Sequence, residues 1–231
     1  GDKKRLATLH YYATHPMSLY GQGHVSGDFV GDAREALPGF HVYFTGAAGN
    51  IGAGKYNDGA PTRRAELAAK LRRAMESAIE HEERTRTLDL RWKSAPVLLP
   101  QRSGPEHQTA ALEKKLNDAS TLPRDRASAA RFLAWQAACQ ARQPISLSAL
   151  AWEGGQVVHM PGELFVEYQL AAQAEAPGQS IAMAAYGDYG PMYIGTAKSY
   201  AEGGYETSWV SRVDPSVEEI LKNAVRGLLK G

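Results

Sequence analysis

Strand-like and helix-like hydrophobic patterns alternate along the whole chain. Ile145–Trp152 has the two-residue alternation of a strand, and Gln156–Met160 follows a glycine-containing turn as its hairpin partner. Thr62–His81 instead repeats its apolar residues every four positions, which is one stripe of an amphipathic helix. Such alternation predicts an α/β or α+β fold, in which a mixed sheet is covered by helices in a single compact domain.

Two segments of this pattern end in residues that can carry chemistry. The β-rich run Arg5–Thr14 leads to His15, at the start of a Pro-broken, Gly-rich loop that closes on Ser26-Gly27-Asp28. A histidine at the end of a strand is well placed to bind a metal or to move a proton, although it can also serve only to hydrogen-bond its loop. Later, Pro161-Gly162-Glu163 is expected to open a helix that runs to Glu175.

The charge and cysteine content exclude several classes of function. The net charge is +1, with 26 basic and 25 acidic residues spread along 231 positions, so a nucleic-acid partner is not expected. No apolar run is long enough to span a bilayer, and a transmembrane segment is not expected. The single cysteine, Cys139, cannot form an internal disulfide.

The glycine-rich stretch Thr45–Gly52 admits a second interpretation. Its sequence, TGAAGNIG, follows a strand and has the spacing of the dinucleotide-binding loop of short-chain dehydrogenases. Dinucleotide binding requires a helix that begins inside the loop, because the helix N-terminus meets the pyrophosphate. Here the loop continues into residues typical of turns, and no Tyr-x-x-x-Lys pair occurs. An NAD(P)-binding dehydrogenase is therefore the weaker alternative.

Three motifs, in order, resemble landmarks of the neutral ceramidases and their bacterial relatives. These enzymes are zinc-dependent amidohydrolases that cleave the N-acyl bond of ceramide. Ala13-Thr14-His15 with Ser26-Gly27-Asp28 is similar to the first landmark, and Pro161-Gly162-Glu163 to the second. Tyr193-Ile194-Gly195-Thr196, with Tyr205-Glu206 after it, is similar to a tyrosine-rich third. The match covers nearly the whole chain.

This resemblance implies a zinc site and an amidase activity. His15, Glu163 and Tyr193 occupy the positions of the family's zinc ligands, and their N, O and O donors are compatible with zinc. With one position open for water, such a metal lowers the pKa of that water and polarises an amide carbonyl. The chain is therefore interpreted as a metal-dependent hydrolase of C–N bonds, with a small-molecule or lipid amide, such as a sphingolipid, as its substrate.

One departure from the family concerns the nucleophile. The family's loop reads approximately N-A-G-N-L-S-P, and its serine is proposed to attack the amide. The corresponding residues here are Ala48-Gly49-Asn50-Ile51-Gly52, with Gly52 at the serine position. Glycine has no side chain that could attack, but its loop can present N–H donors to an oxyanion. Asn50, Gly52 and Tyr205 are the candidate catalytic residues.

A second departure concerns the metal site. The family takes another histidine from an upstream segment, so residues 1–231 are expected to be the C-terminal part of a catalytic domain, completed by an upstream part of the same protein. The isolated piece is expected to hold no stoichiometric zinc and to be inactive, with His159 and His24 as the candidates should another ligand be found within it. The resemblance implies a secreted or periplasmic protein. The remaining alternative is a relative that binds a carbohydrate or lipid without turnover.

Overall fold

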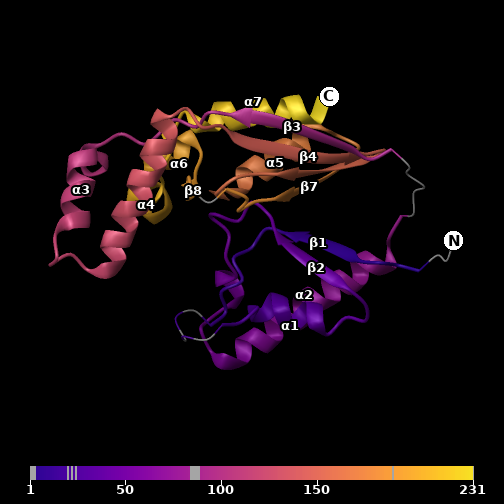
Figure 1. Cartoon of the computed structure of the whole chain (residues 1–231). Helices are drawn as coiled ribbons and strands as arrows, with labels where there is room; N and C mark the ends of the chain where they lie inside the picture. Colours follow the sequence, from indigo (N-terminus) through magenta and orange to yellow (C-terminus); the bar gives the residue numbers. More distant parts are fainter. Residues whose placement is uncertain are drawn as a thin grey trace.

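A mixed four-stranded sheet lies at the centre of the fold (Figure 1). The computed structural model describes residues 4–19, 21, 23, 25–83, 89–188 and 190–230. The order of the strands is β3-β4-β5-β7, and only the β5–β7 pair is parallel. The predicted hairpin is confirmed, since Gly154 in the turn between β4 and β5 has a φ of 87°. The strand bounds are Arg91–Val97 (β3), Ile145–Trp152 (β4), Gly155–His159 (β5) and Ser180–Ala184 (β7).

Two helices, α5 (Val166–Glu175) and α7 (Val217–Lys230), cover one face of this sheet. From β4, Leu147 and Ala149 are completely buried in this core, and from α7 so is Leu221. Alternate residues of β4 point to this side, which is why its predicted two-residue period is seen as alternating burial.

A second, smaller layer lies against the opposite face of the sheet. Its two parallel strands are β1 (Thr8–Tyr12) and β2 (His41–Thr45), and the helices α1 (Asp28–Glu35) and α2 (Pro61–Glu80) cover its outer side (Figure 1). The backbone N–H of Ala185 donates to the Thr45 carbonyl at 3.0 Å, which joins the carboxyl end of β2 to that of β7. The result is a helix–sheet–sheet–helix arrangement with the carboxyl ends of strands from both sheets close together.

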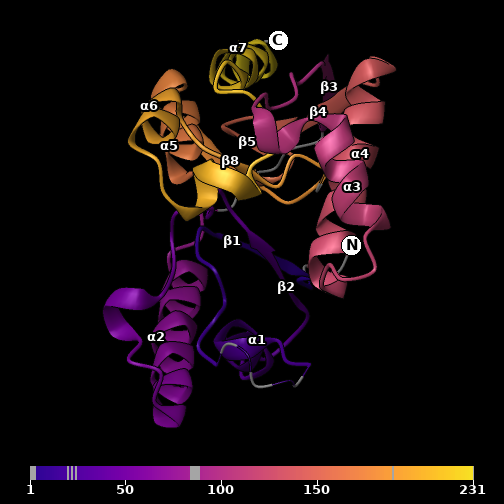
Figure 2. The same cartoon turned by 90° about the vertical axis from the view of Figure 1, so that its left-hand side faces the viewer.

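A helical hairpin projects from one end of the molecule, at the left in Figure 1, and faces the viewer in Figure 2. Its helices are α3 (Thr109–Asn117) and α4 (Pro123–Gln140), and it has a small apolar core around Phe132. The Trp135 indole N–H donates to the Arg212 carbonyl at 2.9 Å and attaches the hairpin to the main body.

The segment around Glu163 differs from the prediction. Glu163 does not begin a helix, because Glu163–Leu164 is a two-residue strand, β6, paired in parallel with β8 (Tyr193–Ile194), and α5 begins only at Val166. The N–H of Glu163 donates to the Met192 carbonyl at 2.8 Å, a tertiary bond that no local pattern signals. The Tyr- and Gly-rich stretch after β7 contains β8, the helix α6 (Ala197–Glu202) and a π-helix, η3 (Glu206–Val210).

The fold class is confirmed: the chain is a mixed α/β domain whose sheets are covered by helices. Among the residues that the structure describes, none of the helices is both long enough and apolar enough to cross a lipid bilayer.

Candidate functional site

His15, Glu163 and Tyr193 meet where the carboxyl ends of the strands converge. Glu163 and Tyr193 are partners in the β6–β8 register, and His15 lies three residues beyond β1. His15 Nε2 is 3.1 Å from Glu163 Oε2, across a sequence separation of 148 residues. The rings of His15 and Tyr193 are stacked with their centres 6.4 Å apart. The structure thus brings these three side chains into one cluster, while their role as metal ligands stays a prediction.

The glycine-rich loop holds His15 from the other side. The His15 backbone N–H donates to the Ile51 carbonyl at 2.9 Å, and the ring Nδ1–H donates to the same oxygen at 3.0 Å. With its proton held at Nδ1, the ring directs Nε2 toward Glu163. A backbone bridge pairs His15 with Gly52, so the loop fixes both the position and the tautomer of the histidine.

The carboxylate of Glu163 sets the protonation of its two neighbours. Only 5% of Glu163 is exposed. Its hydrogen bond raises the pKa of His15 above the ordinary value, with burial opposing that effect. Burial raises the pKa of Tyr193, and the charge of Glu163 together with a hydrogen bond between the two side chains raises it further. Glu163 therefore favours the protonated form of His15 and the neutral form of Tyr193.

Gly162 of the Pro-Gly-Glu motif has a conformational role. Its φ is 60°, in the left-handed region that favours glycine, and a Cβ there would lie 2.5 Å from the Met192 carbonyl oxygen. Its N–H donates to the Asp188 carbonyl at 2.9 Å. The glycine allows the chain to turn tightly against the segment before β8, and this turn directs Glu163 toward His15.

The loop from Ala48 to Gly52 is attached to β6 and α5. The Gly49 N–H donates to the Leu164 carbonyl at 2.7 Å, and Asn50 Oδ1 accepts from the Val166 N–H at 2.9 Å. No helix begins in this loop, since the next α-helix starts at Pro61. The arrangement that binds a pyrophosphate is therefore not formed here, which argues against the dinucleotide interpretation.

The three candidate catalytic residues are placed differently. Gly52 lies beside His15 through the backbone bridge. The Tyr205 ring packs edge-on against Tyr193, with centres 6.0 Å apart, and is 57% exposed. Asn50 instead directs its side chain to α5, where Nδ2 also donates to Glu167 at 3.0 Å. Their catalytic roles stay predictions, with Gly52 and Tyr205 adjacent to the cluster.

Tyr186 is a neighbour of the cluster that sequence reasoning missed. Its hydroxyl is 3.5 Å from His15 Nε2, and its ring meets the His15 ring edge-on with centres 6.2 Å apart. Tyr186 has a φ of 65°, which is uncommon for a residue other than glycine and is often found at functional sites. Tyr186 lies two residues beyond β7, and no sequence motif singled it out.

The alternative histidines do not strengthen the cluster. The His159 ring packs on the Trp92 ring with centres 5.4 Å apart, and its Nδ1 is 3.4 Å from Ser148 Oγ. Both contacts lie on the face of the central sheet. Burial lowers the pKa of His159. His24 lies outside the described residues.

Two of the three predicted donors lie at a separation that a zinc ion allows. Two ligands of a tetrahedral zinc, each at its usual bond length, are roughly 3.4 Å apart. The 3.1 Å between His15 Nε2 and Glu163 Oε2 is close to this separation, and Nδ1 is bonded to a carbonyl as in typical zinc-binding histidines. Within the described part of the chain, no three His, Cys, Asp or Glu side chains form a metal-binding group, so the phenol of Tyr193 would have to be a ligand too.

Ser18 and Asp28 close the loop that follows His15. The Asp28 carboxylate accepts from the Ser18 N–H at 2.9 Å, from the Ser18 hydroxyl at 2.5 Å and from the Phe29 N–H at 2.6 Å. Burial opposes ionisation of Asp28, but these hydrogen bonds outweigh it and lower the pKa of the carboxyl. This part of the first motif therefore shapes the loop.

Replacing Ser18 by alanine is expected to make the chain less stable near neutral pH but not in acid. A carboxyl whose pKa is lower in the folded state stabilises the fold above its unfolded pKa of 3.8, and this contribution disappears as the pH falls through the folded value. At pH 7 the substitution is expected to lower the free energy of unfolding by about 1 kcal/mol. The effect is small because the carboxylate is partly solvated. Urea unfolding of Ser18→Ala at pH 7 and pH 3 measures it.

The control for this experiment is Ser26→Ala. The Ser26 hydroxyl accepts from the Asp28 N–H at 2.9 Å and does not donate to the carboxylate. Its effect on unfolding is expected to be independent of pH over this range. If Ser18→Ala lowers the free energy of unfolding equally at pH 7 and pH 3, the hydrogen bond from Ser18 to the Asp28 carboxylate is not what stabilises the fold.

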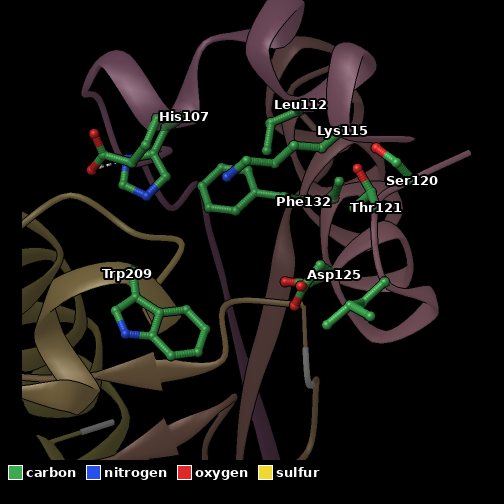
Figure 3. A pocket seen from close by; sticks show the side chains of 12 residues that line it. His107, Leu112, Lys115, Ser120, Thr121, Asp125, Phe132 and Trp209 are labelled. Carbon is green, nitrogen blue, oxygen red and sulfur yellow. Dashed lines mark ion pairs between the residues drawn. The ribbon is translucent and has the colours of Figure 1, made fainter. Parts of the chain in front are cut away.

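An aromatic path leads from the cluster to a neighbouring hollow. The ring of Tyr205 is 5.5 Å from that of Trp209 in η3, and Trp209 is 61% exposed. Figure 3 shows Trp209 facing Phe132 and His107 across a hollow of about 480 Å³ beside the α3–α4 hairpin.

In the comparisons with known proteins, the matches are to solved structures. No protein-family model and no curated protein matches the sequence. A solved structure of neutral ceramidase from Pseudomonas aeruginosa matches with a TM-score of 0.65 at 15% identity, over 97% of this chain and 44% of that one. A ceramidase structure described as complexed with C2 matches with a TM-score of 0.65 at 14% identity, over 97% and 45%. This chain spans less than half the length of the ceramidases, and over nearly all of its own length it has the fold of a neutral ceramidase.

Proposed function

We propose that this chain is part of a metal-dependent amidohydrolase that cleaves N-acyl amides, with a lipid amide as the substrate. One observation carries the proposal: His15, Glu163 and Tyr193 form a cluster around a carboxylate that is only 5% exposed. A buried carboxylate that hydrogen-bonds a histidine and a tyrosine is an unusual arrangement in a core and is typical of functional sites. The ceramidase fold is consistent with amide hydrolysis.

His15 Nε2, Glu163 Oε2 and the Tyr193 phenol would hold the zinc ion. When bound, zinc polarises a carbonyl oxygen and lowers the pKa of a water molecule. The Ile51 carbonyl holds the His15 proton at Nδ1, which leaves Nε2 free to donate its electron pair. Tyr193 must lose its proton to become a ligand, against a pKa raised by burial and by Glu163.

Other side chains of the site can orient the substrate. The Tyr186 hydroxyl, 3.5 Å from His15 Nε2, is a donor within reach of an oxyanion that develops beside the cluster. Tyr205 lies at the exposed edge, where its hydroxyl and ring can contact the incoming amide. The aromatic rings of Tyr205 and Trp209 offer an apolar surface for an alkyl or aryl arm of the substrate.

A metal analysis combined with an amide panel tests the proposal. We infer that a further ligand comes from an upstream part of the protein, so residues 1–231 alone are expected to lose zinc on dialysis against a chelator and to be inactive. The protein from the complete reading frame is expected to retain one zinc and to hydrolyse N-acyl amides. If residues 1–231 hold zinc tightly, the upstream ligand is not needed. A complete protein with neither zinc nor amidase activity contradicts the proposed function.

Replacing Gly52 by serine is expected to add an acyl-enzyme pathway. A Cβ at Gly52 meets nothing closer than the Gly54 nitrogen at 4.0 Å, so a serine fits without strain. We expect increased turnover of an activated N-acyl amide by the complete protein, together with a trapped acyl group at position 52 that mass spectrometry detects. Gly52→Ala is the matched control, since it adds the carbon without the hydroxyl. An acyl group trapped on Ser18 or Tyr205 of the unmodified protein would show that the nucleophile is elsewhere.

Gly52 also supports a second candidate function, in which the protein binds its ligand without turnover. Gly52 removes the side chain that the family proposes as the nucleophile. This candidate predicts that the complete protein binds a lipid amide but releases no amine, a result that the amide panel also detects.

A further inference from the structure

One edge of β1 has no partner among the described strands. In the described part of the chain, β2 is the one strand with which β1 pairs. The Thr8 N–H donates to the Phe40 carbonyl at 2.9 Å, and the Tyr12 carbonyl accepts from Gly46 at 3.1 Å, so alternate residues of β1 bond to the β2 side. By the two-residue period of a strand, the N–H and C=O groups of Leu9 and Tyr11 point away from β2. Such a row of backbone groups is a template for another strand.

Two hollows lie along this free edge of β1. One, of about 530 Å³, is bounded by α2 through residues such as Leu71 and Ala78. The other, of about 700 Å³, is bounded by the central sheet through Leu150 and Trp152. Leu9 and Tyr11 line both hollows. A strand placed beside β1 would therefore contact α2 on one side and the central sheet on the other.

The face of the central sheet beyond β1 is apolar and incompletely covered. The register aligns Trp92 of β3 with Leu150 of β4, and Leu150 with Val157 of β5. Val157, near β1, is 6% exposed, whereas Trp92, at the far edge, is 64% exposed. The second half of β4, from Ala149 to Trp152, is apolar on both faces, as are strands that are covered on both sides, whereas Ser146 and Ser148 make the first half of the outer face polar. An open apolar row of this kind marks an interface.

We propose that a polypeptide segment upstream of β1 adds a strand to the free edge of β1 and covers the row that ends at Trp92. The exposed N–H and C=O groups of the edge are recognised by another backbone, which a lipid chain does not have. Strands consecutive in sequence usually lie side by side, which favours the segment directly before β1. The match covers 44% of the ceramidase chain, so that structure has further polypeptide that the match does not include. The inference rests on the proposed function only in that this segment would also bring the additional zinc ligand.

Amide hydrogen exchange tests the strand addition directly. In residues 1–231 alone, we expect the amides of Leu9 and Tyr11 to exchange rapidly, while those of Thr8 and His10 are protected by β2. In the protein from the complete reading frame, all four are expected to be protected, and acrylamide is expected to quench Trp92 less. A complete protein in which Leu9 and Tyr11 still exchange rapidly overturns the proposal. So does a stable dimer of residues 1–231 with both amides protected, because a second copy would then occupy the edge.

A matched pair of variants separates the backbone contribution from that of the side chain. Leu9→Pro removes the outward N–H, whereas Leu9→Ala shortens the side chain and keeps the N–H. In residues 1–231 the two are expected to unfold at similar temperatures. In the complete protein Leu9→Pro is expected to unfold roughly 4 °C below Leu9→Ala, because one ladder hydrogen bond is lost. Equal midpoints in the complete protein overturn the proposal.

Zinc content distinguishes this inference from the proposed function. Zinc and amidase activity in a complete protein whose β1 edge remains open would overturn the docking proposal and leave the function intact. A protected β1 edge in a protein with neither zinc nor activity would support the docking and contradict the function.

Discussion

Replacing Glu163 by glutamine is expected to abolish zinc retention and amide hydrolysis by the complete protein while leaving the fold intact. Glutamine keeps the size of the side chain and an oxygen that accepts hydrogen bonds, but it carries no charge. The carboxylate is only 5% exposed and contacts both His15 and Tyr193, so its charge is the component that a bound cation would need most. A loss on the order of 100-fold or more in metal affinity is expected.

Metal content after dialysis and the initial rate with an N-acyl amide measure this effect. Glu153→Gln is the matched control, because it makes the same change of charge at an exposed position in the β4–β5 turn. This control is expected to keep both zinc and activity. A Glu163→Gln protein that retains its zinc would show that the carboxylate is not a ligand.

Replacing Gly49 by alanine is expected to destabilise the fold by about 2–3 kcal/mol. A Cβ at Gly49 would lie 3.0 Å from the Leu164 carbonyl oxygen and 3.0 Å from Phe165 Cδ1, and closer still to the Glu163 carbonyl. These atoms cannot move easily, because β6 is paired with β8. The alanine would push the loop away from β6 and break the hydrogen bond from the Gly49 N–H to Leu164, so the support of His15 would be lost as well.

Urea unfolding of residues 1–231 measures the stability of this variant. Gly54→Ala is the control, since a Cβ at Gly54 meets nothing within 4 Å. Its effect is expected to stay within about 0.5 kcal/mol. If both alanines change the free energy of unfolding equally, close packing of the loop on β6 is not what requires Gly49.

Secondary structure with a strong local signal was predictable from the sequence. The hairpin of β4 and β5 has alternating residues on both sides of a glycine turn, and both strands are found where the pattern places them. The helix α2 was predicted from its four-residue repeat, and it begins at Pro61, a residue favoured in the first turn. These features depend on contacts between near neighbours in the sequence, which a periodic pattern encodes.

The two-residue strands β6 and β8 could not be predicted in this way. Glu163–Leu164 is too short to show a period, and its pairing with Tyr193–Ile194 depends on residues thirty positions away. The same reason explains why the prediction began a helix at Pro161, where the chain makes a tight turn on Gly162.

The proximity of His15, Glu163 and Tyr193 was predictable, but the contacts that hold them were not. The order of three motifs, through a resemblance, predicted that His15, Glu163 and Tyr193 belong together. The carbonyl of Ile51 that orients His15, and the hydroxyl of Tyr186 near Nε2, carry no motif. The side chain of Asn50, expected at the site, is bonded instead to the start of α5.

By itself, the sequence determined the class of the fold, the positions of its longer helices and strands, and the residue types available for chemistry, because these depend on local periodicity and composition. Only the tertiary structure decided that His15 and Glu163 meet across 148 positions and that Glu163 is buried between a histidine and a tyrosine. It also decided that, within the residues that the structure describes, one edge of β1 is unpaired beside a partly exposed row of apolar residues. Strand pairing and burial arise from contacts between distant segments, and no local pattern specifies which segments will meet.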